Sequence, residues 1–556
     1  MKEMVSGVWQ GLWSSHRQTK KLLNVFSYKK NISEAEKIRQ VKVQDQTKNQ
    51  GQHPNKQDNE DNKSAYSRAQ LIGLILGPLL FILTMFFFSP EGMSPEARAV
   101  LAVTLWVAIW WITEAIPIPV TSLLPIFLLP LTGAMEADAV TSSYGADIIF
   151  LFLGGFFIAT AMEKWNLHKR MAMAIISFIG TSTQRILLGF MAATGFLSMW
   201  VSNTAAVMMM IPMGLAITAQ VASALKGKPE EKELPKFEKS LIFGIGYAGT
   251  IGGLGTLIGT PPNIILAAQV QELFGAEISF GGWMLIAVPI VVLLLFFTWI
   301  YLGRFAFKMS IKELPGGKEL IQKERTALGQ MTFEEKVVGA VFTFAAFMWI
   351  TRDFIWVNIF PSLKDGMIAV VAAALLFTIP TSKKFGVRIL EWKDSKEIPW
   401  GVLLLFGGGL AIAKGFRESG LSEWIGTQLT VLDGLNLLLI ITLSTVLVLA
   451  LTEITSNTAT ATMMMPILAA LAFSLNIHPF ALMIPAAMAA NCAFMLPVGT
   501  PPNAIIFGTG KLRIIEMVRV GFIINIFVLI LIILTVYFLL PAFWGIDLNA
   551  FPTDYR

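Results

Sequence analysis

The chain has 556 residues, of which 54% are hydrophobic and 14% are charged, with a formal net charge of +6 and a mean hydropathy of +0.64. Soluble domains carry roughly 25% charged residues, so this composition excludes an ordinary soluble protein and indicates a polytopic membrane protein. The single cysteine, Cys492, excludes an intramolecular disulfide framework, and the four histidines are too scattered for a histidine metal site.

The first 68 residues form a polar, basic tail. Its central stretch, 41–63, has almost no apolar residues and is predicted to be disordered. The start of the tail combines Trp9 and Trp13 with Lys20 and Lys21, which fits either an interfacial amphipathic helix or an ordinary tail. Because the tail lacks the basic, apolar and small-residue regions of a signal peptide, we expect it to stay in the cytoplasm.

Apolar segments of membrane-spanning length follow one another from residue 69 onward, so we expect an all-α polytopic membrane protein. Each predicted span is near the ~20 residues that a bilayer requires. Two further apolar segments, one after the fourth span and one after the ninth, are each broken near the middle by the polar word Ser-Asn-Thr. We predict that these two are re-entrant hairpins. The eleven predicted spans are 69–88, 97–113, 116–132, 147–164, 238–258, 283–305, 335–351, 363–380, 399–416, 479–498 and 520–543.

Loop charges predict the orientation of the spans. The predicted cytoplasmic loops carry most of the Lys and Arg residues that follow the tail, whereas the outer loops 89–96, 133–146 and 275–282 carry none. This distribution explains the basic balance without nucleic acid, and it places the N-terminus in the cytoplasm and the C-terminus outside. The exceptions on the outer side are Arg352, Lys364 and Arg417. The cytoplasmic loops are 165–182, 225–237, 306–334, 381–397 and 511–519.

Short words recur along the chain at fixed offsets. Gly154 aligns with Gly408, and Ser202 with Ser456, both at an offset of 254 residues. The word GTPPN begins at Gly259 and again at residue 499, an offset of 240. These matches indicate an internal duplication. Since each copy contains five spans, the second copy enters the membrane from the opposite side, which makes the halves an inverted pair.

The expected organisation follows from this duplication. We predict a cytoplasmic, largely disordered tail and then a first transmembrane helix, two repeats and a cytoplasmic linker. The hairpin of the first repeat opens on the cytoplasmic side and that of the second on the outer side. The predicted divisions are 1–68 for the tail, 69–95 for the first helix, 96–310 for the first repeat, 311–334 for the linker and 335–556 for the second repeat.

The repeated words favour breaks in helices at membrane depth. The prolines of GTPPN interrupt a helix, and Ser, Asn and Thr favour helix N-caps. Non-helical backbone at this depth must line a cavity or lie buried in protein. Four convergent breaks would direct positive helix N-termini at an anion and free carbonyl oxygens for a cation such as Na+. Either word alone is more often a cap or a kink, but both words occurring twice indicate a binding site.

Three acidic residues lie near or within the predicted spans. Glu114 and Asp147 are close to span ends, whereas Glu453 lies three residues before Ser456 and corresponds to Met199 in the first repeat. Glu453 could tune a cation site, carry a proton or hold the hairpin backbone by hydrogen bonds. The four broken segments contain no basic residue, so anion binding would not depend on Lys or Arg.

The paired words resemble those of the divalent anion/sodium symporter family, and most of all its bacterial sodium-dependent dicarboxylate transporters, over about residues 69–545. This resemblance implies a homodimer in which a scaffold domain forms the interface and a transport domain moves like an elevator. It also implies substrate binding at the two tips and the two unwound helices. The residues that match are Ser202, Asn203, Thr204, Thr260, Ser456, Asn457, Thr458 and Thr500.

The resemblance further implies Na+ as the coupling ion, bound at two sites. The first site maps to Ser198, Asn203 and Gly259, and the second maps to Thr452, Thr455, Asn457 and Gly499. A dianion entering a cell at −100 mV is opposed by ~4.6 kcal/mol, at ~2.3 kcal/mol per charge, so two Na+ ions cancel its charge and a third would make uptake electrogenic.

We therefore expect Na+-coupled symport of a C4 dicarboxylate, such as succinate, malate or fumarate, across the cell membrane. The alternatives within transport are a Na+-independent dicarboxylate exchanger and a symporter of sulfate or another divalent anion. A membrane-embedded enzyme would need a nucleophile–base pair or a metal cluster, and the histidines are badly placed for either. An ion channel would not show saturable, Na+-dependent uptake.

Overall fold

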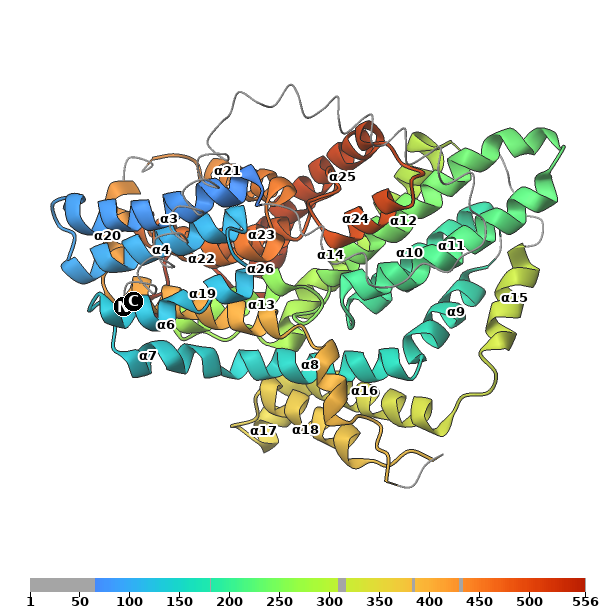
Figure 1. Cartoon of the computed structure of the whole chain (residues 1–556), viewed down its shortest axis with the longest axis horizontal. Helices are drawn as coiled ribbons and strands as arrows, with labels where there is room; N and C mark the ends of the chain where they lie inside the picture. The colour runs from blue at the N-terminus through green and yellow to red at the C-terminus, as the bar shows by residue number, and fades with distance from the viewer. Residues whose placement is uncertain (1–65, 181, 309–316, 383–385, 430–433, 556) are drawn as a thin grey trace, which may run out of the picture. The chain divides into compact units, whose positions relative to one another are not determined.

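A computed structural model describes residues 66–180, 182–308, 317–382, 386–429 and 434–555 (Figure 1). Contacts divide the chain into two units, Met1–Tyr66 and Ser67–Arg556, and the second unit contains all the helices discussed below. The predicted cytoplasmic tail therefore lies almost wholly outside the described residues. Within them the regular structure is helical, apart from one isolated antiparallel bridge between Pro380 and Arg388. This agrees with the predicted all-α class.

The first half of the chain forms a run of helices that the sequence delimits clearly. α3 begins after Ser67, whose hydroxyl accepts a hydrogen bond from the Gln70 amide, and α4 begins after Ser94 with a proline at its first position. The helices are α3 (Arg68–Phe87), α4 (Pro95–Thr113), α5 (Ile118–Thr121), α6 (Leu124–Leu131), α7 (Ala137–Ser142), α8 (Asp147–Lys164), α9 (Leu167–Ile179), α10 (Thr183–Ser198), α11 (Asn203–Leu225), α12 (Leu234–Gly253), α13 (Pro261–Phe274) and α14 (Phe280–Ile300).

The second half repeats the pattern of long helices, broken hairpins and a proline-led short helix. Its helices are α15 (Gly317–Ala327), α16 (Phe333–Thr351), α17 (Val357–Ile359), α18 (Asp365–Thr378), α19 (Trp400–Glu418), α20 (Leu421–Leu429), α21 (Leu437–Ile454), α22 (Asn457–Ser474), α23 (Phe480–Ala490), α24 (Pro501–Gly508), α25 (Ile514–Leu534) and α26 (Leu540–Trp544). Pro212 lies inside α11 and Pro466 inside α22, and they are again 254 residues apart. Corresponding words thus occupy corresponding helices.

Ten helical segments among the described residues are long and apolar enough to cross a membrane, and three of these are hairpin arms. Two predicted spans differ from the structure for a shared reason. The sequence predicts continuous spans over 238–258 and 479–498, but α12 ends at Gly253 and α23 ends at Ala490. The backbone unwinds there, because the GTPPN words downstream start new helices.

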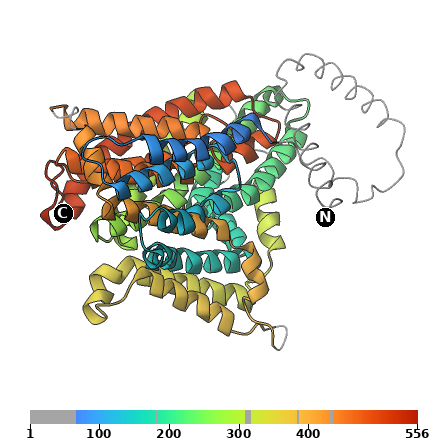
Figure 2. The same ribbon diagram turned by 60° about the vertical axis from the view of Figure 1, so that its left-hand side comes forward.

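Three groups of helices can be distinguished around the breaks. α8, α16 and α18 pack together, as both views in Figures 1 and 2 show, while α10, α11, α12 and α24 pack around the first hairpin. α13, α21, α22 and α23 form the corresponding group around the second hairpin. The contact between α8 and α18 is close enough to require glycine, since a Cβ atom at Gly154 would lie 2.5 Å from the Ala369 carbonyl carbon.

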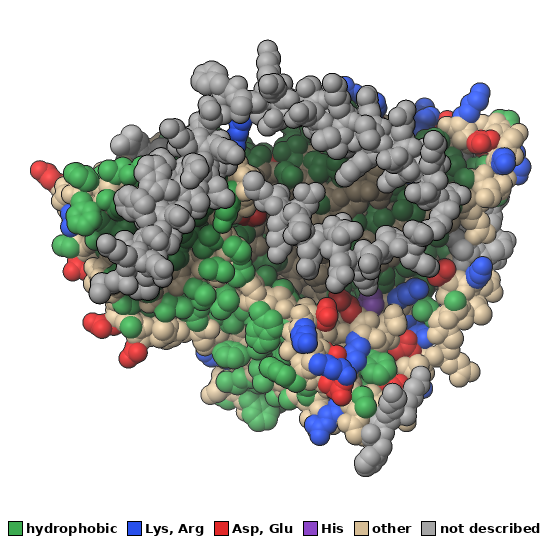
Figure 3. Space-filling view, viewed as in Figure 1, with side chains coloured by type: hydrophobic (Ala, Val, Ile, Leu, Met, Phe, Trp, Pro, Cys, Tyr) green, Lys and Arg blue, Asp and Glu red, His purple; other side chains and the backbone are tan. Residues whose placement is uncertain are grey.

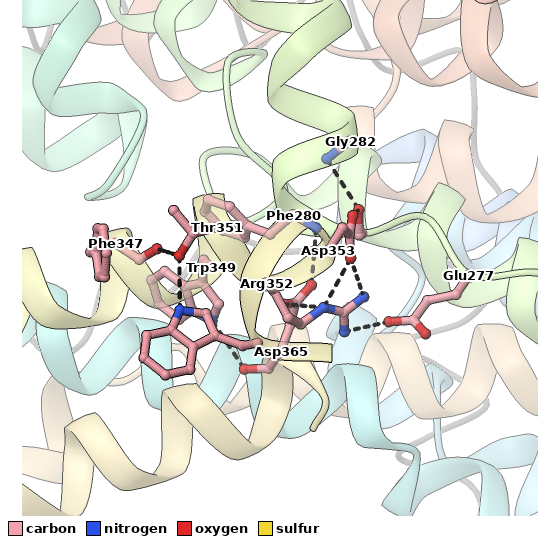
Figure 4. Close-up of polar contacts among 11 residues, drawn as sticks. Glu277, Phe280, Gly282, Phe347, Trp349, Thr351, Arg352, Asp353 and Asp365 are labelled. Carbon is pink, nitrogen blue, oxygen red and sulfur yellow. Dashed lines mark hydrogen bonds and ion pairs between the residues drawn. The ribbon is translucent and has the colours of Figure 1, made fainter. Parts of the chain in front are cut away.

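Arg352, one of the exceptions to the loop-charge pattern, is buried and neutralised (Figure 4). Only 4% of it is exposed, and it pairs with Glu277 at 2.6 Å, Asp353 at 3.2 Å and Asp365 at 3.3 Å. Asp365 also accepts a hydrogen bond from the Phe280 amide at 2.9 Å. The network therefore joins the start of α14 to α16 and α18, so this arginine is a structural cation rather than a free loop charge.

Charged side chains separate toward the two ends of the helices. Figure 3 shows Lys and Arg mainly toward the right-hand end and lower side of the view, whereas Asp and Glu predominate at the left-hand end. In Figure 1 the right-hand end holds α15 and the turn between α11 and α12, and the left-hand end holds α20 and the turn between α3 and α4. The three-dimensional arrangement thus keeps the separation of charge that the loop sequences carry.

Candidate binding site

The two Ser-Asn-Thr words form the tips of helical hairpins, one between α10 and α11 and the other between α21 and α22. Ser202 caps α11, because its hydroxyl accepts a hydrogen bond from the Ala205 amide at 3.1 Å. Ser456 holds the equivalent extended backbone position before α22 but makes no side-chain cap bond. Each word therefore marks the point where one half-helix ends and the next begins, as the residue types predict.

The two GTPPN words form the restart points of unwound helices. Thr260 precedes α13 and Thr500 precedes α24, and both threonines have extended backbone angles. The Thr500 hydroxyl accepts a hydrogen bond from the Asn503 amide at 3.3 Å, whereas Thr260 makes no such cap bond. Prolines at the first helical positions leave no backbone donor to satisfy there.

The last residue of each GTPPN word holds the unwound backbone that precedes it. Both asparagines are fully buried, and the side-chain amide of each donates to carbonyl groups seven and ten residues upstream. These hydrogen bonds satisfy carbonyls that the broken helix would otherwise leave unpaired in a water-free interior. They run from Asn263 to Gly253 (3.2 Å), Leu254 (3.2 Å) and Thr256 (2.8 Å), and from Asn503 to Ala493 (3.0 Å) and Leu496 (2.9 Å).

One cavity of about 1,340 Å³ joins all four breaks. The N-termini of α11, α13, α22 and α24 reach this cavity, so four positive helix ends converge on one space. Every substrate-binding residue expected from the sequence lines it: Ser202, Asn203, Thr204, Thr260, Ser456, Asn457, Thr458 and Thr500. Of the expected sodium residues, Ser198 and Thr452 are fully buried and do not line the cavity, whereas the others do.

Behind the first tip lies a cluster of three oxygen atoms. The Ser198 hydroxyl is 2.5 Å from the Asn203 side-chain oxygen and 2.5 Å from the Gly249 carbonyl. A hydroxyl has a single proton, so it can donate to only one of these two oxygens. A Cβ at Gly253 would lie 2.6 Å from the Asn203 side-chain oxygen, which explains why glycine is needed there. The hydroxyl oxygen then lies close to a second oxygen with no proton between them, and such a pair of oxygens suits a bound cation.

Behind the second tip the same cluster recurs. The Thr452 hydroxyl is 2.6 Å from the Asn457 side-chain oxygen and 2.5 Å from the Ala490 carbonyl. That side-chain oxygen also faces the carbonyls of Gly499 and Ala490, both at 3.2 Å. Four oxygens that face one another require either a cation between them or a half-turn of the amide, after which its two N–H groups face the other three oxygens.

Two expected ligands have other hydrogen-bond partners. The Thr455 hydroxyl contacts the Leu451 carbonyl at 2.8 Å and the Thr460 hydroxyl at 2.5 Å, and so does not face the oxygen cluster of the second tip. The Thr260 hydroxyl donates to the Asn491 side-chain oxygen at 2.6 Å. Asn491 in turn donates to the Thr250 carbonyl at 2.8 Å, so it links the unwound segments of the two halves.

Glu453 is 2% exposed and binds the second unwound segment. Its carboxylate oxygens accept hydrogen bonds from three successive backbone amides and from the Asn525 side chain at 2.7 Å. All of these partners are donors, which is the environment that a carboxylate requires. The amides are those of Phe494 (2.9 Å), Met495 (3.1 Å) and Leu496 (3.1 Å). Of the three roles left open by the sequence, the hydrogen bonds support the one that holds the backbone.

Acidic residues are the only charged groups among the described residues that line the cavity. Glu114, Glu163 and Glu397 lie along its wall, and no Lys or Arg among the described residues does so. An anion in this cavity would therefore bind hydroxyls, amides and helix N-termini, as the absence of basic residues from the repeated words predicts.

Comparison with known proteins places these features in context. The family model described as the sodium:sulfate symporter transmembrane region matches residues 68–546. A protein of Staphylococcus saprophyticus named sodium-dependent dicarboxylate transporter SdcS is 58% identical over 494 residues, which are 88% of this chain and 95% of that protein. A Staphylococcus aureus protein of the same name is 57% identical over 491 residues, 88% of this chain and 94% of that protein.

Solved structures show similarity in fold alone. The crystal structure of the Alcanivorax borkumensis YdaH transporter superimposes with a TM-score of 0.51 and 12% sequence identity, and the match covers 86% of this chain and 98% of that one. The helical arrangement is therefore shared with a transporter of very different sequence.

Replacing Asn503 by Ala should lower the thermal stability of the protein. The change removes two buried hydrogen bonds and takes from the Ala493 carbonyl its side-chain donor, whereas the Leu496 carbonyl keeps the Gly499 amide; a buried group left unpaired costs roughly 1–3 kcal/mol. The midpoint of thermal unfolding in detergent measures this loss. The control is Asn358→Ala, because that exposed side chain donates to a carbonyl on the surface. Equal midpoints for the two variants would contradict the role assigned to Asn503.

Proposed function

The chain belongs to the sodium:sulfate symporter family, and from this we propose that it couples the inward movement of Na+ to the uptake of a C4 dicarboxylate. Its relatives are transporters, so the protein is a transporter rather than an enzyme. The observation that carries the proposal is the single cavity in which two hairpin tips, two unwound helices and two oxygen clusters meet.

The cavity offers groups that can bind each carboxylate of a dicarboxylate. Carboxylates favour helix N-termini, and four converge here together with the hydroxyls and amides of both tips. The two tips come from opposite halves of the chain, so each is positioned to hold one end of a molecule with two carboxylates. Succinate, malate and fumarate have this form.

The two oxygen clusters suit Na+ as the coupling ion. Each contains a hydroxyl, a side-chain amide oxygen and a backbone carbonyl near the C-terminal end of a helix, that of Gly249 in α12 or Ala490 in α23. Helix C-terminal ends and unwound carbonyls coordinate Na+ in secondary transporters. Asn203 and Asn457 belong both to a cluster and to the wall of the cavity, so a bound ion fixes the amide that faces the substrate. Because the same asparagine contacts both the ion and the substrate, the binding of one favours the binding of the other.

Dicarboxylate is favoured over sulfate by the names of the two staphylococcal relatives, although the family description names sulfate. Exchange without Na+ is disfavoured, because the polar groups of both oxygen clusters are present.

Uptake of radiolabelled succinate into proteoliposomes tests the function. We expect an inward Na+ gradient to drive uptake and K+ alone to give none, and we expect Asn457→Ala to lower the rate at least about tenfold by removing a ligand of both ion and substrate. Asn358→Ala, on the surface, should match the wild type. Equal uptake in K+ would point to exchange, and full competition by sulfate would point to a sulfate transporter.

We also infer an elevator mechanism with the cavity open to the cytoplasm. The cavity is lined by the start of α3 and the ends of α4 and α8, which the loop charges assign to the cytoplasmic side. α8, α16 and α18 would stay fixed while the hairpins and unwound helices slide past them. This assignment places the N-terminus in the cytoplasm and the C-terminus outside.

A disulfide between a fixed helix and a moving unwound segment tests the sliding. A Cβ at Gly155 would lie 3.7 Å from the Ile258 Cβ, a separation that suits a disulfide. In a Cys492→Ala background, oxidation of Gly155→Cys/Ile258→Cys should stop uptake, and reduction should restore it. Ile258→Cys alone lines the cavity, so an impermeant thiol reagent should label it faster from the cytoplasmic side. Full activity of the oxidised pair would contradict the mechanism.

We further propose that the transporter is a homodimer, as its resemblance to the divalent anion/sodium symporters implies. Many large apolar side chains remain exposed on α3, α16 and α25, which leaves surface for lipid and for a second copy. Light scattering of the purified protein should give about twice the chain mass of 61.1 kDa after subtraction of detergent. A mass of one chain in lipid nanodiscs as well as in detergent would contradict the dimer.

A further inference from the structure

We propose that Glu453 makes the two sodium sites unequal, so that the second site binds Na+ more tightly and fills first. The inference rests on the proposed function and goes beyond it, because the neutral ligands of the two sites are nearly the same. Each site has a hydroxyl, the asparagine of its tip and a backbone carbonyl near a helix C-terminus, with contacts of 2.5–2.6 Å in both halves. On these groups alone, the two sites would have similar affinities.

The halves differ at the residue that follows the hydroxyl. In the first half Met199 follows Ser198, and in the second half Glu453 follows Thr452. Met199 is an uncharged side chain, and a Cβ at Gly255 would lie 2.9 Å from its terminal methyl group. At the same position in the second repeat the chain has a buried carboxylate. The duplication itself therefore isolates one charged difference between two otherwise matched sites.

The unwound segments are held by different chemistry as a result. In the first half the Thr256 hydroxyl donates to the Met199 carbonyl at 2.5 Å and accepts from the Gly259 amide at 3.0 Å, so neutral groups fix the segment. In the second half the Glu453 carboxylate accepts from the amides of residues 494–496. Besides the buried asparagine that holds each segment, the first segment is therefore held by a hydroxyl and the second by a carboxylate.

The charge acts on the second sodium site in two ways. Leu496, which donates to Glu453, also accepts a hydrogen bond from the Gly499 amide at 3.2 Å, so the carboxylate fixes the turn that presents the Gly499 carbonyl. The carboxylate has no Lys or Arg partner among the ion pairs of the described residues, so its negative charge favours a cation nearby. Glu453 is thus a positioning residue that also supplies a negative electrostatic potential at the second sodium site, without itself contacting the ion.

The experiment measures Na+ binding without succinate by isothermal titration calorimetry, and succinate uptake in proteoliposomes, for wild type, Glu453→Gln and Met199→Gln. We expect Glu453→Gln to weaken the tighter Na+-binding step about tenfold, because a nearby charge is lost, while the rate of uptake at saturating Na+ and succinate changes less than about twofold. Met199→Gln places the same amide at the matched position of the first site and should change neither value by more than about twofold.

Two further measurements separate this role from a loss of folding. Glu453→Asp keeps the charge with a shorter side chain, so it should recover part of the Na+ affinity, and Na+ should still raise the unfolding midpoint of Glu453→Gln at high concentration. An unchanged Na+ dependence in Glu453→Gln, or an equal shift in Met199→Gln, would overturn the proposal. If the wild type itself shows no Na+ dependence, the proposed function fails, whatever the variants do.

Discussion

The binding site depends on one constraint, which is that backbone carbonyls freed by a broken helix must find partners where water is excluded. The chain breaks four helices around one cavity and then satisfies most of the freed groups from within. Asn263 and Asn503 take five of the carbonyls, and Glu453 takes three of the freed amides. At each tip one hydroxyl faces both a backbone carbonyl, that of Gly249 or Ala490, and an asparagine oxygen, and this shortage of protons is the basis of the proposed sodium sites.

The sequence predicted the breaks well, because proline and capping residues act locally and the repeats supplied an internal alignment. Composition and the apolar segments of spanning length likewise predicted the helical class and the membrane setting. The spans around 238–258 and 479–498 were drawn too long, since hydropathy does not register where an apolar helix stops. Each helix ends upstream of its GTPPN word. The distance between the two depends on the hydrogen bonds that the buried asparagine makes to the preceding backbone.

Several site features could not be predicted from the sequence. Gly249 and Ala490 contribute only backbone carbonyls, and nothing in their side chains indicates that role. Asn491 contacts Thr260 across 231 residues, a pairing that no local pattern contains. The asparagines of the two GTPPN words recur in the sequence, but their hydrogen-bond partners depend on the path of the unwound chain. The role of Glu453 was open for the same reason, because its donors lie about forty residues away.

The bond between Thr260 and Asn491 makes the two halves of the chain unequal. It joins the restart of the first unwound helix to the residue after α23, whereas the first half has Thr250 and Ile251 near the matching position. The two halves are therefore not interchangeable, and a substitution at either residue changes a contact with the other half.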